Sequence, residues 1–264
     1  MCLSDFKSQK VCFFDSGIGG LNLLYEASLK LPYAEFFYFA DNYRVPYGNL
    51  SDGELISAVD GIFSKIAKIN PDAAVIACNT VTARCVAYLR GKYSFPIIGI
   101  QPAVKEAAKH GKNCVVFATP STAESESLKA LIRTYGNGST EVIACPEFAQ
   151  FVEQNIFGLN EEKLINLLPD VEADAVVLGC THYIFVKEAV EKKYGCPAFT
   201  GVEGTVKRLL KILGYSGDGN SAPQVPEITF VGGDEEKNKR VFYDVLCARC
   251  DVWGNFSQKF PKNS

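Results

Sequence analysis

The stretch DAVVLGCTHY, residues 174–183, repeats a phrase that the chain already contains as DAAVIACNTV, residues 72–81. In each phrase an aspartate precedes a short apolar run, and a cysteine followed by hydroxyl or amide residues closes it. A continuous apolar run of this length is typical of a strand in a parallel sheet that helices cover on both faces. The repetition therefore predicts two such sheets, with Cys78 and Cys180 at equivalent strand ends.

The same alternation of strand and helix surrounds both phrases. In the first half we expect strands at residues 10–17, 35–41, 72–80 and 96–100, and helices at 20–31, 55–69 and 81–93. The pattern restarts with strands at 113–122, 139–148 and 174–183 and helices at 123–136, 151–156, 160–172 and 186–195. A last helix, strand and helix at 205–215, 227–234 and 239–250 are expected to return to the first half.

The spacing of chemistry-bearing residues supports an internal duplication. Asp15 lies 63 residues before Cys78, and Thr119 lies 61 residues before Cys180. We therefore predict an α/β fold of two pseudo-symmetric domains, each a parallel sheet flanked by helices. The first domain would comprise residues 1–101 plus about 205–264, and the second would comprise residues 102–204. Since open parallel sheets bind ligands at the carboxyl ends of their strands, both thiols should face one crevice between the domains.

The composition argues against several kinds of partner. The chain has 264 residues and a net charge of −3, without a run of five or more Lys and Arg residues, which disfavours nucleic acid and anionic membranes. Its sequence has no apolar run long enough to span a bilayer, and the N-terminal residues lack the apolar core of a signal peptide. We expect a cytoplasmic protein whose ten cysteines are reduced thiols.

Metal and redox roles for the cysteines are disfavoured as well. Structural zinc usually takes four Cys or His ligands in paired short spacings. Here the CARC pair, Cys247 and Cys250, stands without a second pair, and the chain has only two histidines. The CARC pair also follows a helix-like run rather than a strand-to-helix turn, which disfavours a redox motif. We expect no metal and no cofactor.

Two thiols on opposite sides of one carbon suit the inversion of a stereocentre that bears a proton. One thiol removes the proton from one face, the other returns a proton to the opposite face, and a thiol pKa of about 8.5 can be tuned toward neutrality. A cysteine hydrolase with Cys180 as nucleophile and His182 as base is an alternative, but it leaves Cys78 without a role. A protein that binds an amino acid without turning it over is the alternative from another class.

Four motifs connect the chain to a known family. FDSGIGGL (14–21), RVPYG (44–48), ACNT (77–80) and GCTHY (179–183) occur in the order and spacing of bacterial glutamate racemases, which the chain resembles over nearly its whole length. The resemblance implies a cofactor-independent enzyme that interconverts L- and D-glutamate, supplies D-glutamate for peptidoglycan and commonly forms a homodimer. An aspartate or hydantoin racemase, which shares the two-thiol logic, is the nearest alternative enzyme.

The resemblance also implies roles for individual positions. Cys78 would take the α-proton from D-glutamate and Cys180 from L-glutamate. Asp15 and His182 would assist them, and Glu153 would support the histidine. The substrate-binding positions that it implies are Asp15, Ser16, Pro46, Tyr47, Gly48, Asn79, Thr80, Thr119, Thr122, Thr181 and His182. Departures from the family pattern, such as VTA after the first Cys-Asn-Thr and IF after Thr-His-Tyr, leave these positions unchanged.

Overall fold

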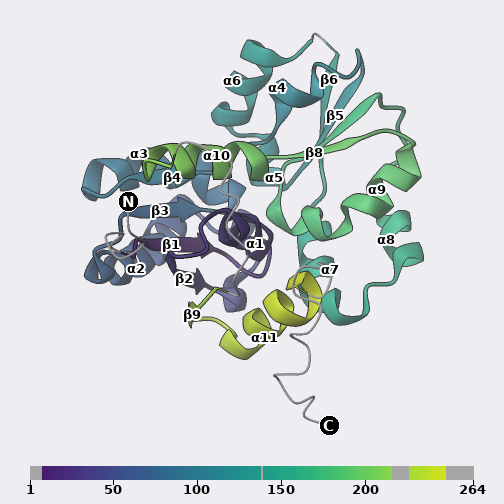
Figure 1. The fold of residues 1–264 in the computed structure, drawn as a ribbon. Coiled ribbons are helices and arrows are strands. Elements are labelled where there is room, and N and C mark those ends of the chain that lie inside the picture. The colour runs from purple at the N-terminus through teal and green to yellow at the C-terminus, as the bar shows by residue number, and fades with distance from the viewer. Residues whose placement is uncertain (1–7, 138, 216–225, 248–264) are drawn as a thin grey trace.

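The computed structural model describes residues 8–137, 139–215 and 226–247, which form two α/β lobes side by side (Figure 1). The first lobe contains a five-stranded sheet of order β4-β3-β1-β2-β9, and the second contains a four-stranded sheet of order β6-β5-β7-β8. Every strand pair in both sheets is parallel. The expected fold class, two parallel sheets flanked by helices, is confirmed.

The two repeated phrases occupy equivalent places in the two sheets. The strands of the first sheet are β1 (Lys10–Asp15), β2 (Glu35–Ala40), β3 (Ala73–Ile76), β4 (Ile97–Gly99) and β9 (Ile228–Val231). Those of the second are β5 (Cys114–Ala118), β6 (Thr140–Ala144), β7 (Ala175–Leu178) and β8 (Ala198–Thr200). Each phrase forms the strand next to its lobe's first strand, so that β3 pairs with β1 and β7 pairs with β5.

The aspartate that opens each phrase performs the same structural task in both lobes. Asp72 Oδ2 accepts a hydrogen bond of 2.8 Å from the backbone N–H of Lys10. Asp174 Oδ2 accepts bonds of 2.9 Å from the N–H groups of both Lys112 and Asn113. Each carboxylate thus satisfies backbone donors where the neighbouring strand begins, which explains why the repeated phrase starts with this residue.

Helices cover both faces of each sheet. Along β1, Val11 and Phe13 pack under α1 and α10, whereas Cys12 and Phe14 pack against α2 and α3 on the opposite face. These helices are α1 (Leu21–Lys30), α2 (Asp52–Ile69), α3 (Asn79–Lys92) and α10 (Val202–Ile212). The second sheet lies between α4 (Val104–Ala107) and α6 (Glu126–Tyr135) on one face and α7 (Phe148–Asn155), α8 (Glu161–Leu167) and α9 (Lys187–Tyr194) on the other. Burial on both faces accounts for the unbroken apolar runs of the strands.

Several elements differ in extent from the sequence prediction. The helix expected at 160–172 ends at Leu167, because Pro169 disfavours the helical conformation in the residue before it. The short elements α4, β8 and α5 (Pro120–Ala123) were not predicted. The last helix begins earlier than expected, as α11 (Glu235–Arg240), and continues as a π-helical turn over Val241–Leu246. Cys250 of the CARC pair lies outside the described residues.

The eight cysteines within the described part of the chain are all free thiols. Among the residues that the structure describes, no helix combines the length and apolar character needed to cross a membrane.

The chain passes between the lobes twice, and the two passages touch. A Cβ atom on Gly201 would lie 2.8 Å from Ile100 Cγ1 and would collide with the carbonyl oxygen of Gln101. The C-terminal segment then rejoins the first lobe, because β9 pairs with β2. The boundaries expected for the two domains, near residues 101 and 205, stay a prediction.

We expect Gly201→Ala to destabilise the fold by about 1–3 kcal/mol, because the added methyl group over-packs the contact between the two passages. Urea denaturation followed by circular dichroism measures this loss. Gly204→Ala is the matched control, since Gly204 lies in α10 with no atom within 4 Å of its would-be Cβ. That variant should gain roughly 0.5–1 kcal/mol from helix propensity. Equal stability of the two variants would contradict the packing described here.

Candidate active site

The glycine-rich turn after β1 is folded by the carboxylate of Asp15. Its Oδ1 accepts a 2.7 Å hydrogen bond from the N–H of Ser16, and its Oδ2 accepts one from the N–H of Gly20. The hydroxyl of Tyr38 in β2 donates to the carbonyl oxygen of Gly17 at 2.6 Å and so fixes the turn to the neighbouring strand. Burial raises the pKa of Asp15, although the charge of His182 and the two backbone donors oppose this effect. Asp15 therefore organises the turn as well as placing charge within it.

The glycines of this turn allow the second lobe to approach the first. A Cβ atom on Gly17 would collide with Glu153 Oε2, and one on Gly19 would lie 2.7 Å from the backbone nitrogen of His182. The hydroxyl of Thr181 reaches across to Asp15 Oδ2 at 3.2 Å. No side chain larger than hydrogen fits at these points, so the turn serves close contact between the lobes.

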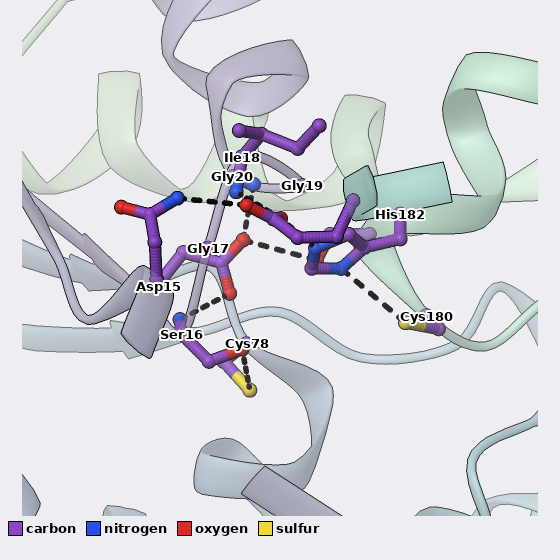
Figure 2. A network of polar contacts seen from close by, with 12 residues as sticks. Asp15, Ser16, Gly17, Ile18, Gly19, Gly20, Cys78, Cys180 and His182 are labelled. Atoms are coloured by element: carbon purple, nitrogen blue, oxygen red, sulfur yellow. Dashed lines mark hydrogen bonds and ion pairs between the residues drawn. The ribbon is translucent and has the colours of Figure 1, made fainter. Parts of the chain in front are cut away.

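The two thiols come from equivalent strand ends and meet at one cavity. Cys78 follows β3 and precedes α3, and Cys180 follows β7 and precedes a 3-10 helix over Thr181–Val186. Both residues are buried, and both line the same small cavity between the lobes. In Figure 2, Cys78 lies beside Ser16 of the turn and Cys180 lies beside His182. The structure thus brings together two residues that are 102 positions apart in the sequence.

The environment of Cys78 favours its protonated form. Burial raises the pKa of the Cys78 thiol well above its usual range, and the negative charges of Asp15 and Cys180 add to this effect. The backbone N–H of Val81 in the first turn of α3 acts in the opposite direction, and so does Ser16. The thiol donates to Ser16 Oγ at 3.7 Å. These surroundings therefore favour the neutral thiol of Cys78, and a positive charge beside it would favour the thiolate.

Cys180 belongs to a chain of three polar side chains. Its sulfur lies 3.9 Å from His182 Nδ1, and His182 Nε2 lies 2.7 Å from Glu153 Oε2. Burial disfavours the charged imidazole, but the contacts with Cys180 and Glu153 outweigh it and raise the pKa of His182 well above its usual value. Burial likewise opposes ionisation of Glu153, yet the bond and charge of His182, with further donors, lower its pKa to about 2. His182 and Glu153 thus form a buried imidazolium–carboxylate pair.

Glu153 has partners in the first lobe that the sequence did not reveal. Its Oε2 accepts from the N–H of Ile18 at 2.9 Å, and its Oε1 accepts from Asn42 Nδ2 and Lys237 Nζ, each at 2.8 Å. Asn42 lies just beyond the carboxyl end of β2, which is a weak signal in the sequence. Lys237 lies in a charged helix that reads as solvent-exposed and gives no signal.

Most of the residues implied by the resemblance line the cavity. The lining includes Ser16, Pro46, Tyr47, Gly48, Cys78, Asn79, Thr80, Thr119, Cys180, Thr181 and His182. Asp15, Thr122 and Glu153 lie directly behind this wall, bonded to its members. The cavity measures about 10 Å³, which is room for about one water molecule. Two larger hollows elsewhere on the surface contain neither thiol.

Hydroxyl and amide groups gather at the Cys78 end of the cavity. The hydroxyls of Thr80, Thr119 and Thr122 lie 3.1–3.5 Å from one another. Asn79 Oδ1 is buried and has no hydrogen-bond partner within the described structure. The hydroxyl of Tyr47 instead donates to Asp41 Oδ2 at 2.7 Å, so this side chain shapes the wall and turns its polar end away. No group of three or more His, Cys, Asp and Glu residues in the described ranges is placed to hold a metal ion.

Comparison with known proteins identifies the family. A family model described as Asp/Glu/Hydantoin racemase matches residues 37–209. The chain belongs to the Asp/Glu/Hydantoin racemase family. It is therefore an isomerase, and its similarity to curated relatives agrees with this assignment. Glutamate racemase 2 of Bacillus subtilis is 37% identical over 218 residues, which cover 77% of this chain and 82% of the relative. Glutamate racemase of Clostridium acetobutylicum is 37% identical over 78% of this chain and 85% of its own.

Solved racemase structures share the two-lobed arrangement. Escherichia coli glutamate racemase, in complex with L-glutamate and the activator UDP-MurNAc-ala, superposes with a TM-score of 0.77 at 25% identity and covers 91% of this chain and 95% of its own. Glutamate racemase of Campylobacter jejuni superposes with a TM-score of 0.73 at 26% identity, over 90% of this chain and 99% of its own.

The lowered pKa of Glu153 predicts an acid-dependent loss of stability. The shift from 4.5 to about 2 corresponds to roughly 3 kcal/mol that is present above pH 4.5 and is lost as the pH falls toward 2. Between about pH 5 and pH 3, the wild type should lose roughly 2 kcal/mol more unfolding free energy than Glu153→Gln. Urea titrations at each pH measure the difference. Glu147, an exposed residue just before α7, gives the control Glu147→Gln, whose unfolding free energy should depend on pH as that of the wild type does. The same pH dependence in all three proteins would contradict the lowered pKa of Glu153.

Proposed function

We propose that this racemase interconverts L- and D-glutamate without a cofactor, using Cys78 and Cys180 on opposite faces of the α-carbon. The observation that carries the proposal is the position of two buried thiols, one from each lobe, on a single cavity. Curated relatives that are named glutamate racemases and cover most of the chain support glutamate as the substrate. The RVPYG motif at residues 44–48 favours glutamate over aspartate or a hydantoin.

The reaction needs one proton transfer on each face of the substrate. In the direction from D- to L-glutamate, the Cys78 thiolate takes the α-proton and the Cys180 thiol delivers a proton to the opposite face. The enzyme is left with a Cys78 thiol and a Cys180 thiolate, so the protons must be redistributed before the next turnover. The imidazolium of His182, 3.9 Å from the Cys180 sulfur, stabilises that thiolate. The reverse reaction uses the same groups with exchanged roles.

The substrate itself supplies the charge that the Cys78 half-site lacks. The ammonium group of glutamate would meet the carboxylate of Asp15 and the unpartnered Oδ1 of Asn79. A positive charge at this point would favour the thiolate of Cys78, whose pKa is raised by burial and by Asp15. Binding therefore activates the base at the moment when the substrate arrives.

Stabilisation of the carbanion falls to hydrogen-bond donors around the carboxylates. Asn79 and Thr80 begin α3 and line the cavity, so their backbone N–H groups would be donors for the α-carboxylate, because helix N-termini favour anions. The hydroxyls of Thr80, Thr119 and Thr122 are donors for the second carboxylate. Each preorganised donor contributes about 3 kcal/mol when charge develops in the transition state.

The closed cavity requires movement of the lobes during turnover. A volume of about 10 Å³ admits no glutamate, so the lobes must separate for binding. Closure around the substrate then excludes water and strengthens the polar contacts inside. The touching passages at Gln101 and Gly201 are where such a movement would be centred.

The proposal extends to the biological setting. The resemblance to bacterial glutamate racemases supports a cytoplasmic homodimer that provides D-glutamate for peptidoglycan synthesis.

A substrate panel in deuterated water tests the function. Both enantiomers of glutamate should be racemised, with solvent deuterium incorporated at the α-carbon, and chelators should have no effect. Activity confined to aspartate or to hydantoins would overturn the assignment of the substrate. Binding of glutamate without any deuterium uptake would identify a binding protein instead.

Serine replacement of each thiol tests the two-base mechanism. We expect Cys78→Ser and Cys180→Ser each to lower racemisation at least a hundredfold, because general acid–base catalysis commonly contributes 10²–10⁴ in rate. Each variant should keep exchange of the α-proton of the enantiomer that its remaining cysteine attacks, measured by NMR in deuterated water. Cys196→Ser, which changes a thiol outside the cavity, should keep full activity. Full racemisation by either active-site variant would contradict the mechanism.

A further inference from the structure

Lys237 connects the C-terminal segment to the Cys180 half-site. It lies in α11, directly after the strand that rejoins the first sheet, and its Nζ contacts both Glu153 Oε1 at 2.8 Å and the Glu153 carbonyl oxygen at 2.6 Å. The helix is capped by Asp234, which accepts from the Lys237 N–H at 3.0 Å. The amide of Asn238 bonds Asn42 Oδ1 at 3.0 Å, which fixes the second donor to the same carboxylate. The cap by Asp234 and the bond from Asn238 to Asn42 therefore fix the helix segment that carries Lys237.

The carboxylate of Glu153 is divided between two sets of donors. Oε2 accepts from His182 Nε2 and from the N–H of Ile18, whereas Oε1 accepts from Asn42 and Lys237. Because Lys237 occupies Oε1, the carboxylate cannot rotate away from His182 without breaking a charged hydrogen bond. The orientation of the imidazole, and with it the nitrogen that faces Cys180, depends on this arrangement.

Lys237 also balances the charge of the buried cluster. The carboxylates of Asp15 and Glu153 contribute two negative charges, and His182 with Lys237 contributes two positive ones. The side chains of Glu153 and His182 are 7% and 3% exposed, and that of Lys237 is 22% exposed. Without Lys237 one negative charge would lie buried and uncompensated, which is costly in such surroundings.

We propose that Lys237 is a positioning residue for racemisation, which holds Glu153 and through it keeps His182 oriented beside Cys180. The role rests on the proposed function, since it concerns the same two-thiol site. Lys237 does not line the cavity, and the contacts of its ammonium group are with Glu153, which lies behind the cavity wall. Its effect should accordingly fall on the chemical step rather than on binding.

The charge of Lys237 gives the proposal a distinct pH signature. The groups that face His182 are Glu153 of α7, Asp15 at the end of β1 and Cys180, with Cys78 across the cavity. The Lys237 ammonium, on the far oxygen of Glu153, opposes protonation of this cluster. Its removal should raise the pKa of His182 further and move the alkaline limb of kcat/KM to higher pH. Simple loss of stability would lower the profile without moving it.

The experiment compares Lys237→Met, Lys237→Arg and Arg240→Met. We expect Lys237→Met to lower kcat about tenfold to a hundredfold, by analogy with residues that orient metal-binding histidines through hydrogen bonds, with KM changed less than about twofold. Lys237→Arg should restore most of the rate and the position of the alkaline limb. Arg240→Met removes a charge from the same helix and the contact of its guanidinium with the Phe157 ring at 4.3 Å, and it should match the wild type. An equal loss in Arg240→Met and Lys237→Met, with no rescue by arginine, would overturn the proposal.

A double-mutant cycle and an NMR titration complete the test. If Lys237 acts through Glu153, Lys237→Met should have little further effect on kcat in a Glu153→Gln background. The double variant lacks both charges of the Lys237–Glu153 pair, so removal of the lysine leaves no unpaired carboxylate at position 153. The chain has two histidines, so ¹⁵N signals of His182 can be assigned with His110→Gln. The His182 titration should move to higher pH in Lys237→Met, whatever substrate the enzyme accepts, so this readout separates the proposal from the glutamate assignment. An unmoved titration, or additive effects in the cycle, would refute the role of Lys237.

Discussion

The contact between the carboxylate of Glu153 and the glycine-rich turn is the constraint on which the site depends. Glu153 belongs to the second lobe, and the N–H of Ile18 that it accepts belongs to the first. The bond from Thr181 to Asp15 crosses the same boundary in the opposite direction. The glycines at the points of closest approach leave room for these two bonds, which link the two halves of the polar network between Cys78 and Cys180 (Figure 2). Both thiols line the same cavity. Loss of this contact would leave two separate half-sites, each with one thiol and without the thiol of the other lobe.

The cluster around this contact is arranged for chemistry rather than for stability. A buried set of charges contributes little net stability, because removal from water offsets most of the mutual attraction. Here Cys180 and the carboxylate of Glu153 raise the pKa of His182, whereas burial and the carboxylate of Asp15 raise the pKa of the Cys78 thiol. The two half-sites thus share a strand-end thiol but differ in electrostatics. The ammonium group of an amino acid would reduce this difference, which suits a reaction that must run equally well from both enantiomers.

The sequence predicted the lobes well because apolar runs and strand-end residues are local features. The phrases around Cys78 and Cys180 identified both central strands, and parallel strands place their carboxyl ends together by geometry. The resemblance to a family supplied Glu153, which no local pattern marks. Lys237 and Asn42 escaped prediction because their partner is 84 and 111 positions away and their surroundings read as ordinary polar surface. Tyr47 shows the same limit, since only the position of Asp41 reveals where its hydroxyl points.

A crystal structure with glutamate bound tests the central claim most directly, through the distances from the α-carbon to the two sulfur atoms. The account predicts that the α-carbon lies between the sulfurs of Cys78 and Cys180, roughly 3–3.5 Å from each, with one sulfur on each face. Sulfurs on the same face of the α-carbon, or a substrate that contacts only one of them, would contradict a two-base racemase.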